Sequence, residues 1–177
     1  MRKLILAVAV IGLLSLSAFG QTESSKFDFF AGYSYLHVGD AGSDANIPAG
    51  FELQGTGYFN KNFGITGDFS GHYKSIGGVD ANIHNFLFGP TFRADVGRAK
   101  PFGHFLVGGE RAGVGFAGGT ASDTAFAYAL GGGIDVAATK NVSIRLIQAD
   151  WVRSHFVDDW QNHTRLSFGV VFNIGAR

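Results

Sequence analysis

Apolar and polar residues alternate with a period of two along much of the chain after residue 25. Residues 63–74 show this most clearly and read FGITGDFSGHYK. The odd-numbered positions of this segment are aromatic, aliphatic or glycine, and the even-numbered positions are small, polar or charged. Because successive side chains of a β-strand point to opposite faces, the pattern predicts a strand with one apolar and one polar face.

Eight segments of this kind follow one another, which predicts an all-β fold. The phase of three of them is ambiguous: Phe30 and Leu36 interrupt the first, Gln148 and Asp150 fall on the apolar positions of the seventh, and the fifth has no clear phase. A β-bulge in the seventh would shift its phase. In the fourth, Pro90 lacks a backbone donor, so we expect a bulge or an irregularity there. The predicted strands are residues 26–38, 50–59, 63–74, 83–94, 101–112, 124–137, 142–153 and 162–174.

The predicted connections alternate in length. Those at residues 60–62, 95–100 and 138–141 are short, whereas those at 40–49, 75–80, 113–123 and 154–161 are mostly longer, polar and rich in glycine. Bacterial membrane barrels have an even number of strands, short periplasmic turns and longer outer loops. The pattern therefore predicts an eight-stranded antiparallel up-and-down transmembrane β-barrel.

The amino terminus predicts export. Met1, Arg2 and Lys3 precede an apolar run at residues 4–16, and small residues follow at Ala18 and Gly20. This is typical of a secretory signal peptide, expected over residues 1–20 with the barrel over 21–177. The chain has no cysteine, so disulfides cannot stabilise the exported part. A closed barrel would stabilise it instead by pairing every strand edge.

The predicted strands carry aromatic and aliphatic residues on one face and charges on the other. An arginine or lysine facing lipid at the bilayer midplane costs about 2–4 kcal/mol, so the apolar face should meet lipid. The alternative is a secreted, lipocalin-like binding barrel, with the rings inside and the charges in water. Eight aromatic rows would overfill so narrow a lumen. The residues expected to face lipid are Phe63, Ile65, Phe69, Tyr73, Phe86, Phe88, Phe92, Phe126, Tyr128, Leu130, Leu166, Phe168, Val170 and Phe172.

The polar faces predict an ionic network inside the barrel. Pairing would compensate for the burial of these charges, and small residues such as Gly131 and Gly133 would make room for longer side chains. Such a network would fill the lumen and have a structural role. Asp28, Glu52 and Glu110 are expected near it. Its predicted members are Asp68, His72, Arg93, Asp135, Arg145 and Arg165.

Four segments carry a resemblance to a known family: FFAGYSYL (29–36), YALGGGIDV (128–136), SIRLIQADW (143–151) and RLSFGVVFNI (165–174). The chain resembles the eight-stranded bacterial outer-membrane β-barrels, such as the transmembrane domain of outer-membrane protein A. The resemblance implies an outer-membrane location, contact with the bilayer and lipopolysaccharide, and a monomeric barrel. It also implies a C-terminal signal read by periplasmic chaperones and the outer-membrane assembly machinery. This signal would comprise Ser167, Gly169, Phe172 and Ile174, although three further residues follow where most members end on an aromatic residue.

Other motifs carry little weight. The glycines at 113, 115 and 118 spell GxGxxG without a preceding βα unit, which predicts a flexible loop. Ser154 and His155, followed by Asp158 and Asp159, resemble a nucleophile set, but adjacent residues on a loop seldom hold that geometry. Trp151 and Trp160 are expected in an interfacial aromatic belt.

These observations predict a structural or surface-exposed membrane protein that is not an enzyme. A net charge of zero argues against a nucleic-acid partner, and neither a cofactor nor a metal is expected. A narrow, low-conductance porin is the alternative within the same architecture. The alternatives from other classes are the lipocalin-like binder and a barrel enzyme that acts on lipids.

Overall fold

The computed structural model describes residues 25–39, 45–76, 79–116, 119–156 and 159–176. The predicted signal peptide at residues 1–20 lies outside this part of the chain. No helix among the described residues is long and apolar enough to cross a membrane. The strands are β1 (Ser25–Gly39), β2 (Ala45–Ile47), β3 (Ala49–Tyr58), β4 (Phe63–Ile76), β5 (Val79–Arg93), β6 (Ala99–Phe116), β7 (Gly119–Ala137), β8 (Val142–Phe156) and β9 (Asp159–Ala176).

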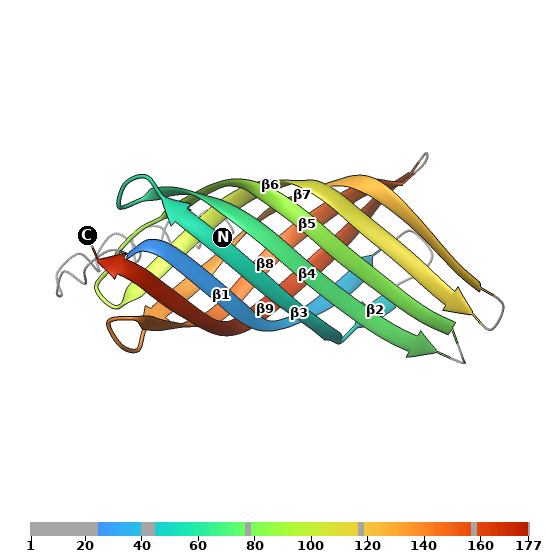
Figure 1. The fold of residues 1–177 in the computed structure, drawn as a ribbon, viewed down its shortest axis with the longest axis horizontal. Helices are drawn as coiled ribbons and strands as arrows, with labels where there is room; N and C mark the ends of the chain where they lie inside the picture. The colour runs from blue at the N-terminus through green and yellow to red at the C-terminus, as the bar shows by residue number, and fades with distance from the viewer. Residues whose placement is uncertain (1–24, 40–44, 77–78, 117–118, 157–158, 177) are drawn as a thin grey trace, which may run out of the picture.

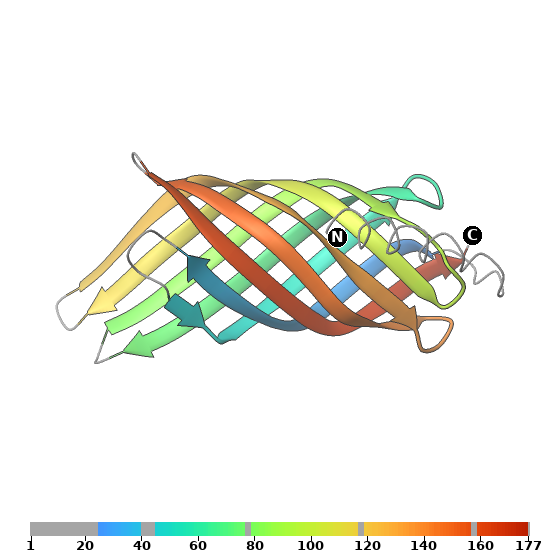
Figure 2. The ribbon, with the colours of Figure 1, turned by 180° about the vertical axis from the view of Figure 1, so that it is seen from behind.

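The strands close into an antiparallel barrel, as the sequence predicts. Neighbours along the sheet follow the order β2-β1-β3-β4-β5-β6-β7-β8-β9, and β1 also pairs with β9 over nearly its whole length. Figures 1 and 2 show this closure from opposite sides. The short β2 and the longer β3 both pair with β1 and are separated by Pro48, which has no N–H to continue the ladder. The barrel therefore has eight long strands and one short addition.

The two ends of the barrel differ. The turns after β3, β5 and β7 are short and lie at the same end as the carboxyl terminus of β9 (Figure 1, left). At the other end, pairing continues to Ile76↔Val79, Phe116↔Gly119 and Phe156↔Asp159. The prediction of long connections at residues 75–80, 113–123 and 154–161 is therefore wrong, because most of these residues are paired strand.

Small polar residues can extend a hairpin beyond the bilayer because a strand ladder needs only backbone hydrogen bonds. Gly113 and Gly115, which the GxGxxG motif places in a flexible loop, instead pair with Ser122 and Thr120 of β7. The third glycine of the motif lies outside the described residues.

The predicted bulge in β8 is confirmed. The register shifts between Arg145 and Gln148 on the β9 side, and Asp135↔Arg145 is followed by Ile134↔Ile147 on the β7 side. Leu146 and Ile147 are consecutive yet both exposed, at 57% and 52%. The extra residue changes the phase of the strand and moves its later polar residues into the lumen.

Pro90 causes the expected irregularity but no bulge. The pairs Phe88↔Val107 and Thr91↔His104 keep one register with β6, although the ladder between them is interrupted. On its other side, Pro90 pairs with Ile65 in an unbroken register. Proline removes one donor but inserts no extra residue, and the strand therefore stays in phase.

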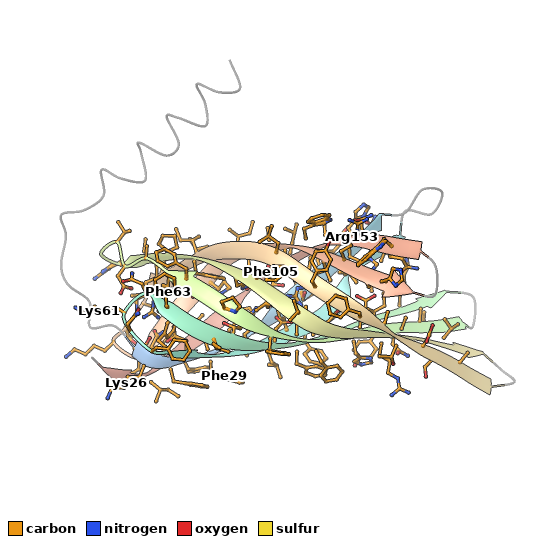
Figure 3. The ribbon with its side chains drawn as sticks, turned by 90° about the horizontal axis from the view of Figure 1, so that it is seen from above. Lys26, Phe29, Lys61, Phe63, Phe105 and Arg153 are labelled. Carbon is orange, nitrogen blue, oxygen red and sulfur yellow. The ribbon has the colours of Figure 1, made fainter. Side chains whose placement is uncertain are left out.

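The two surfaces of the barrel have opposite chemistry. Phe63, Phe88 and Phe168 are more than half exposed on the outside, whereas Arg93 and Arg165 are at most 1% exposed inside. Figure 3 shows Phe29, Phe63 and Phe105 projecting outward. This arrangement contradicts the lipocalin-like alternative, which requires the rings inside.

The structure also settles the ambiguous phases of the first and fifth predicted strands. Phe30 and Leu36 of β1 lie in the lumen, buried at 1% and 0%. In β6, Phe105 is exposed and Leu106 is buried. Of the residues expected to face lipid, Phe69, Tyr128 and Val170 are partly covered, and the others are exposed.

Candidate functional site

Arg165 of β9 forms the centre of the polar lumen. Its Nη1 lies 2.9 Å from Asp68 Oδ1 of β4, and its Nη2 lies 2.8 Å from Asp150 Oδ2 of β8. Glu52 Oε1 of β3 lies 3.4 Å from the same Nη2. Side chains from four strands thus meet at one guanidinium, whose planar array of donors can serve several acceptors at once.

Two glutamine amides separate the carboxylates around Arg165. Gln54 Nε2 donates to Glu52 Oε1 at 2.6 Å and to Asp68 Oδ2 at 2.9 Å. Gln148 Nε2 donates to Glu52 Oε1 and to Asp150 Oδ2, both at 2.7 Å. These amide protons give each carboxylate a donor besides Arg165, which reduces the cost of burying like charges together.

Arg145 of β8 has a different environment. Its Nε and Nη2 form a two-point contact with Asp135 of β7, at 2.7 and 3.0 Å. Its guanidinium carbon lies 4.2 Å from the ring centres of both Phe30 and Phe102. Its Nη1 donates to Gln54 Oε1 at 2.6 Å, which links this pair to the Arg165 cluster. The same Nη1 also donates to Gln148 Oε1 at 2.5 Å. One acid, two rings and two amides therefore hold this arginine.

Arg93 of β5 forms a separate ion pair nearer the short turns. Its Nη1 lies 2.6 Å from Asp28 Oδ2 of β1, and its guanidinium lies 3.9 Å from the ring centre of Tyr58. Asn173 Nδ2 donates to Asp28 Oδ1 at 2.9 Å. This pair joins β1, β5 and β9 close to one mouth of the barrel.

Glu110, Ser154 and His163 meet beyond the Arg165 cluster. Ser154 Oγ lies 3.1 Å from Glu110 Oε1 and 3.2 Å from His163 Nε2. The same Nε2 lies 3.3 Å from Glu110 Oε1. A catalytic triad uses one ring nitrogen for the nucleophile and the other for the acid, so this arrangement does not form a relay.

The nucleophile set suggested by the sequence does not assemble. Ser154 is fully buried in the lumen, while the next residue, His155, packs on Trp160 with ring centres 4.7 Å apart. Consecutive residues of a strand point to opposite sides of the sheet. Ser154 and His155 belong to β8 and Asp159 begins β9, so these residues lie on paired strands rather than on a loop. Asp158 lies outside the described residues.

The structure places all six predicted network residues inside the barrel. Arg145 and Asp135 contact each other, Arg165 contacts Asp68, and Arg93 contacts acids outside this set. His72 makes no ion pair among the described residues, and its Nε2 lies 3.0 Å from Ser34 Oγ. Apart from His72, the predicted residues thus belong to two linked clusters and one separate pair.

Sequence reasoning missed several members of the network. Asp150 and Gln148 were hidden by the bulge at Leu146, which reverses the alternation that follows it. Gln54 lies on the expected polar face but carries no charge to draw attention. His104 belongs to β6, the strand whose phase was ambiguous, and its Nε2 lies 2.8 Å from Asp150 Oδ1 of β8.

The remaining lumen is apolar on one side. Leu87, Leu106 and Val152 pack with two alanines of β7 in a buried apolar cluster. Gly131 makes room for Asp150, since a Cβ there would lie 1.9 Å from Asp150 Oδ1. Small β7 residues therefore make room in the lumen, but chiefly for an aspartate and for Phe102 rather than for arginines.

The decisive comparison is with protein families. The model of the outer membrane protein beta-barrel domain matches residues 6–173. The chain belongs to this family. It is therefore an integral protein of the bacterial outer membrane, where its exposed rings lie in the bilayer within a lipopolysaccharide environment. A search of curated protein sequences finds no match.

Solved structures share the fold at low sequence identity. Neisserial surface protein A (NspA) is 17% identical with a TM-score of 0.70, over 85% of this chain and 98% of that one. Ail, the attachment invasion locus protein of Yersinia pestis, is 20% identical with a TM-score of 0.58, over 84% and 99%. OprG of Pseudomonas aeruginosa is 10% identical with a TM-score of 0.55, over 90% and 100%. At these identities the likeness concerns the fold.

Proposed function

We propose that this protein is a monomeric, non-enzymatic barrel whose side-chain-filled lumen stabilises it as a structural or surface-exposed component of the outer membrane. The observation that carries the proposal is the cluster around Arg165. It joins β3, β4, β8 and β9 across the lumen through buried side chains. An eight-stranded barrel is just wide enough for such side chains to fill, and this one uses polar groups that pair with one another.

The polar groups that might suggest catalysis support a structural role instead. Ser154, His163 and Glu110 are at most 1% exposed, and a single ring nitrogen contacts both of the other side chains. A substrate would have to displace paired groups to reach Ser154. The proposal therefore excludes the lipid-acting enzyme, and release of fatty acid from lipopolysaccharide by the purified protein would overturn this part.

The carboxyl-terminal strand supports assembly by the outer-membrane machinery after transit with periplasmic chaperones. In β9, Phe172 and Ile174 are exposed at 46% and 55% on the outer side, and Ser167 lies in the lumen. We propose that these residues, together with Gly169, form the assembly signal. Phe172→Ala should slow membrane insertion more than Val171→Ala, because Val171 is buried in the lumen.

Planar-bilayer recording tests the filled lumen. Inserted wild-type protein, whose folding is checked by its altered gel migration without heating, should show no steady conductance. Steady small steps would instead establish the low-conductance porin. In that case a changed step size in Arg93→Ala or Arg145→Ala would locate the path, since these residues lie in different clusters.

A further inference from the structure

An external groove lies on β5, β6 and β7 at the end opposite the short turns. We call it the rim groove and define it by Asn82, His84, Arg111, Gly113 and Ser122, with Phe86 at its membrane side. Its volume is about 570 Å³. β1 begins and β9 ends at the end with the turns after β3, β5 and β7, and an even-stranded bacterial barrel has both chain ends on the periplasmic side. The rim groove, at the opposite end, therefore faces the outer leaflet.

The strand register arranges this surface in rows. The pairs Phe86↔Gly109 and Gly109↔Phe126 form a row of two exposed rings with a gap between them. One step outward, the pairs His84↔Arg111 and Arg111↔Thr124 form a polar row. The change from apolar to polar surface therefore falls between adjacent rows, where acyl chains end and lipid head groups begin.

The polar part of the rim groove is built from hydrogen-bond donors. Arg111 Nη2 donates to Ser122 Oγ at 3.0 Å, and Arg111 takes part in no ion pair with another described residue. His84 Nε2 lies 2.9 Å from Tyr73 Oη. The guanidinium thus carries a positive charge at the head-group level beside the Ser122 hydroxyl, and its planar donors match two oxygens of a phosphate.

The missing side chain at Gly113 makes room for Asn82 in the rim groove. A Cβ at Gly113 would lie 2.7 Å from Asn82 Oδ1, so the amide of Asn82 occupies the space that a larger residue would take. On the membrane side, a Cβ at Gly109 would meet nothing closer than 3.6 Å. The gap between Phe86 and Phe126 therefore continues toward Arg111.

We propose that the rim groove binds the phosphorylated glucosamine head group of lipid A, the membrane anchor of lipopolysaccharide. Arg111 holds a phosphate, His84 and Asn82 contact the sugar, and an acyl chain passes Gly109 between the two rings. This interaction adds a specific lipid site to the proposed structural role. It does not depend on whether the lumen conducts.

The test measures binding of lipid A to the folded protein in detergent micelles by native mass spectrometry. Lipid A with both phosphates is compared with the same lipid after both are removed. The wild-type protein should prefer the phosphorylated form at least about tenfold, because a net hydrogen bond to a charged group contributes about that factor. Equal affinity for the two forms would overturn the proposal.

Three variants locate the site, each first checked for folding by its gel migration. Arg111→Gln should lose about tenfold in affinity for the phosphorylated lipid and most of the preference. Gly113→Val should weaken binding without changing the charge, because its side chain enters the rim groove. Arg98→Gln removes the same charge from an exposed turn at the opposite end and should bind like wild type.

Arg153 provides a stricter control. It lies on the outer side of β8, 4.8 Å above the Trp160 ring, near the same end of the barrel (Figure 3). Arg153→Gln should leave the preference largely intact if the rim groove is the site. A loss equal to that of Arg111→Gln would overturn the rim groove in favour of a diffuse cationic belt.

Discussion

The outer surface and the lumen of this barrel are made by the same strands but depend on different interactions. Outside, rings pack on one another, as in Phe69 and Phe86 with centres 4.7 Å apart or Phe63 and Phe92 at 5.0 Å. Inside, Arg165 is held by individual atoms of several acids. The outside therefore requires only apolar side chains at suitable depth, whereas the inside requires particular partners.

The largest effect is expected from Arg165→Ala. The change leaves three buried carboxylates, Asp68, Asp150 and Glu52, without their shared cation. Removing one partner of a buried ion pair costs about 3–5 kcal/mol, and we expect a loss of unfolding free energy at the upper end of that range. Urea unfolding of the refolded barrel in detergent micelles measures it.

Arg145→Ala is the matched comparison for the same measurement. Only Asp135 loses a cation, and the other partners of Arg145 are the neutral Gln54 and Gln148 and two rings. The loss of unfolding free energy in Arg145→Ala should therefore be smaller, about 3 kcal/mol. An equal or larger loss than that of Arg165→Ala would contradict the view that the number of orphaned carboxylates sets the cost.

The next effect tests the outer surface. Phe69→Arg, midway along the apolar row of β4, should cost about 2–4 kcal/mol because it places a charge in hydrocarbon. Phe59→Arg is the control, since Phe59 is 68% exposed at the rim beside a short turn, where the cost falls to about 0–1 kcal/mol. Similar losses for both variants, measured by folding yield in vesicles, would contradict the assigned membrane depth.

Ser70→Arg is not a mild counterpart of Phe69→Arg, although the alternation alone ranks it so. Ser70 Oγ accepts a hydrogen bond from Arg165 Nη1 at 2.9 Å and is fully buried. A second cation there would meet Arg165 directly. Only the packing inside the barrel reveals this.

The smallest effect concerns one ring in the lumen. Phe30→Leu keeps an apolar side chain but removes one of the two rings that enclose Arg145. The loss should be about 1 kcal/mol, the scale of a partly desolvated cation–π contact. Phe29→Leu changes the neighbouring residue on the outer face and should leave the unfolding free energy almost unchanged. A greater loss for Phe29→Leu would reverse the assigned faces of β1.

The architecture could be predicted from the sequence because it depends on local alternation, which each strand displays independently. Asp68 and Arg165 could be placed in the lumen for the same reason. Their pairing could not, because it joins residues 97 positions apart across the barrel. The lengths of the outer hairpins were also missed, since glycine, serine and threonine are typical of turns as well as of exposed strand ends.

The aromatic residues inside the barrel show a further limit of prediction from the sequence. Phe30 interrupts the alternation of β1 and made the phase of this strand ambiguous, yet it packs over Arg145 inside the lumen. Asp150 falls on the apolar positions of the predicted strand, and only the inserted residue in β8 brings it into the lumen. Such departures from a simple pattern mark the places where the lumen is specifically packed.

The most direct test of the account uses methyl groups that lie on both faces of the barrel. In an NMR experiment on the protein in nanodiscs, methyl protons of Ile65, Leu130 and Leu146 should show cross-relaxation with lipid acyl-chain protons, because these residues are exposed at 49%, 55% and 57%. Those of Leu36, Leu87 and Leu106, exposed at 3% or less, should show none. Acyl-chain contacts at the second set and their absence at the first would contradict the orientation on which the lipid-facing surface and the filled lumen both depend.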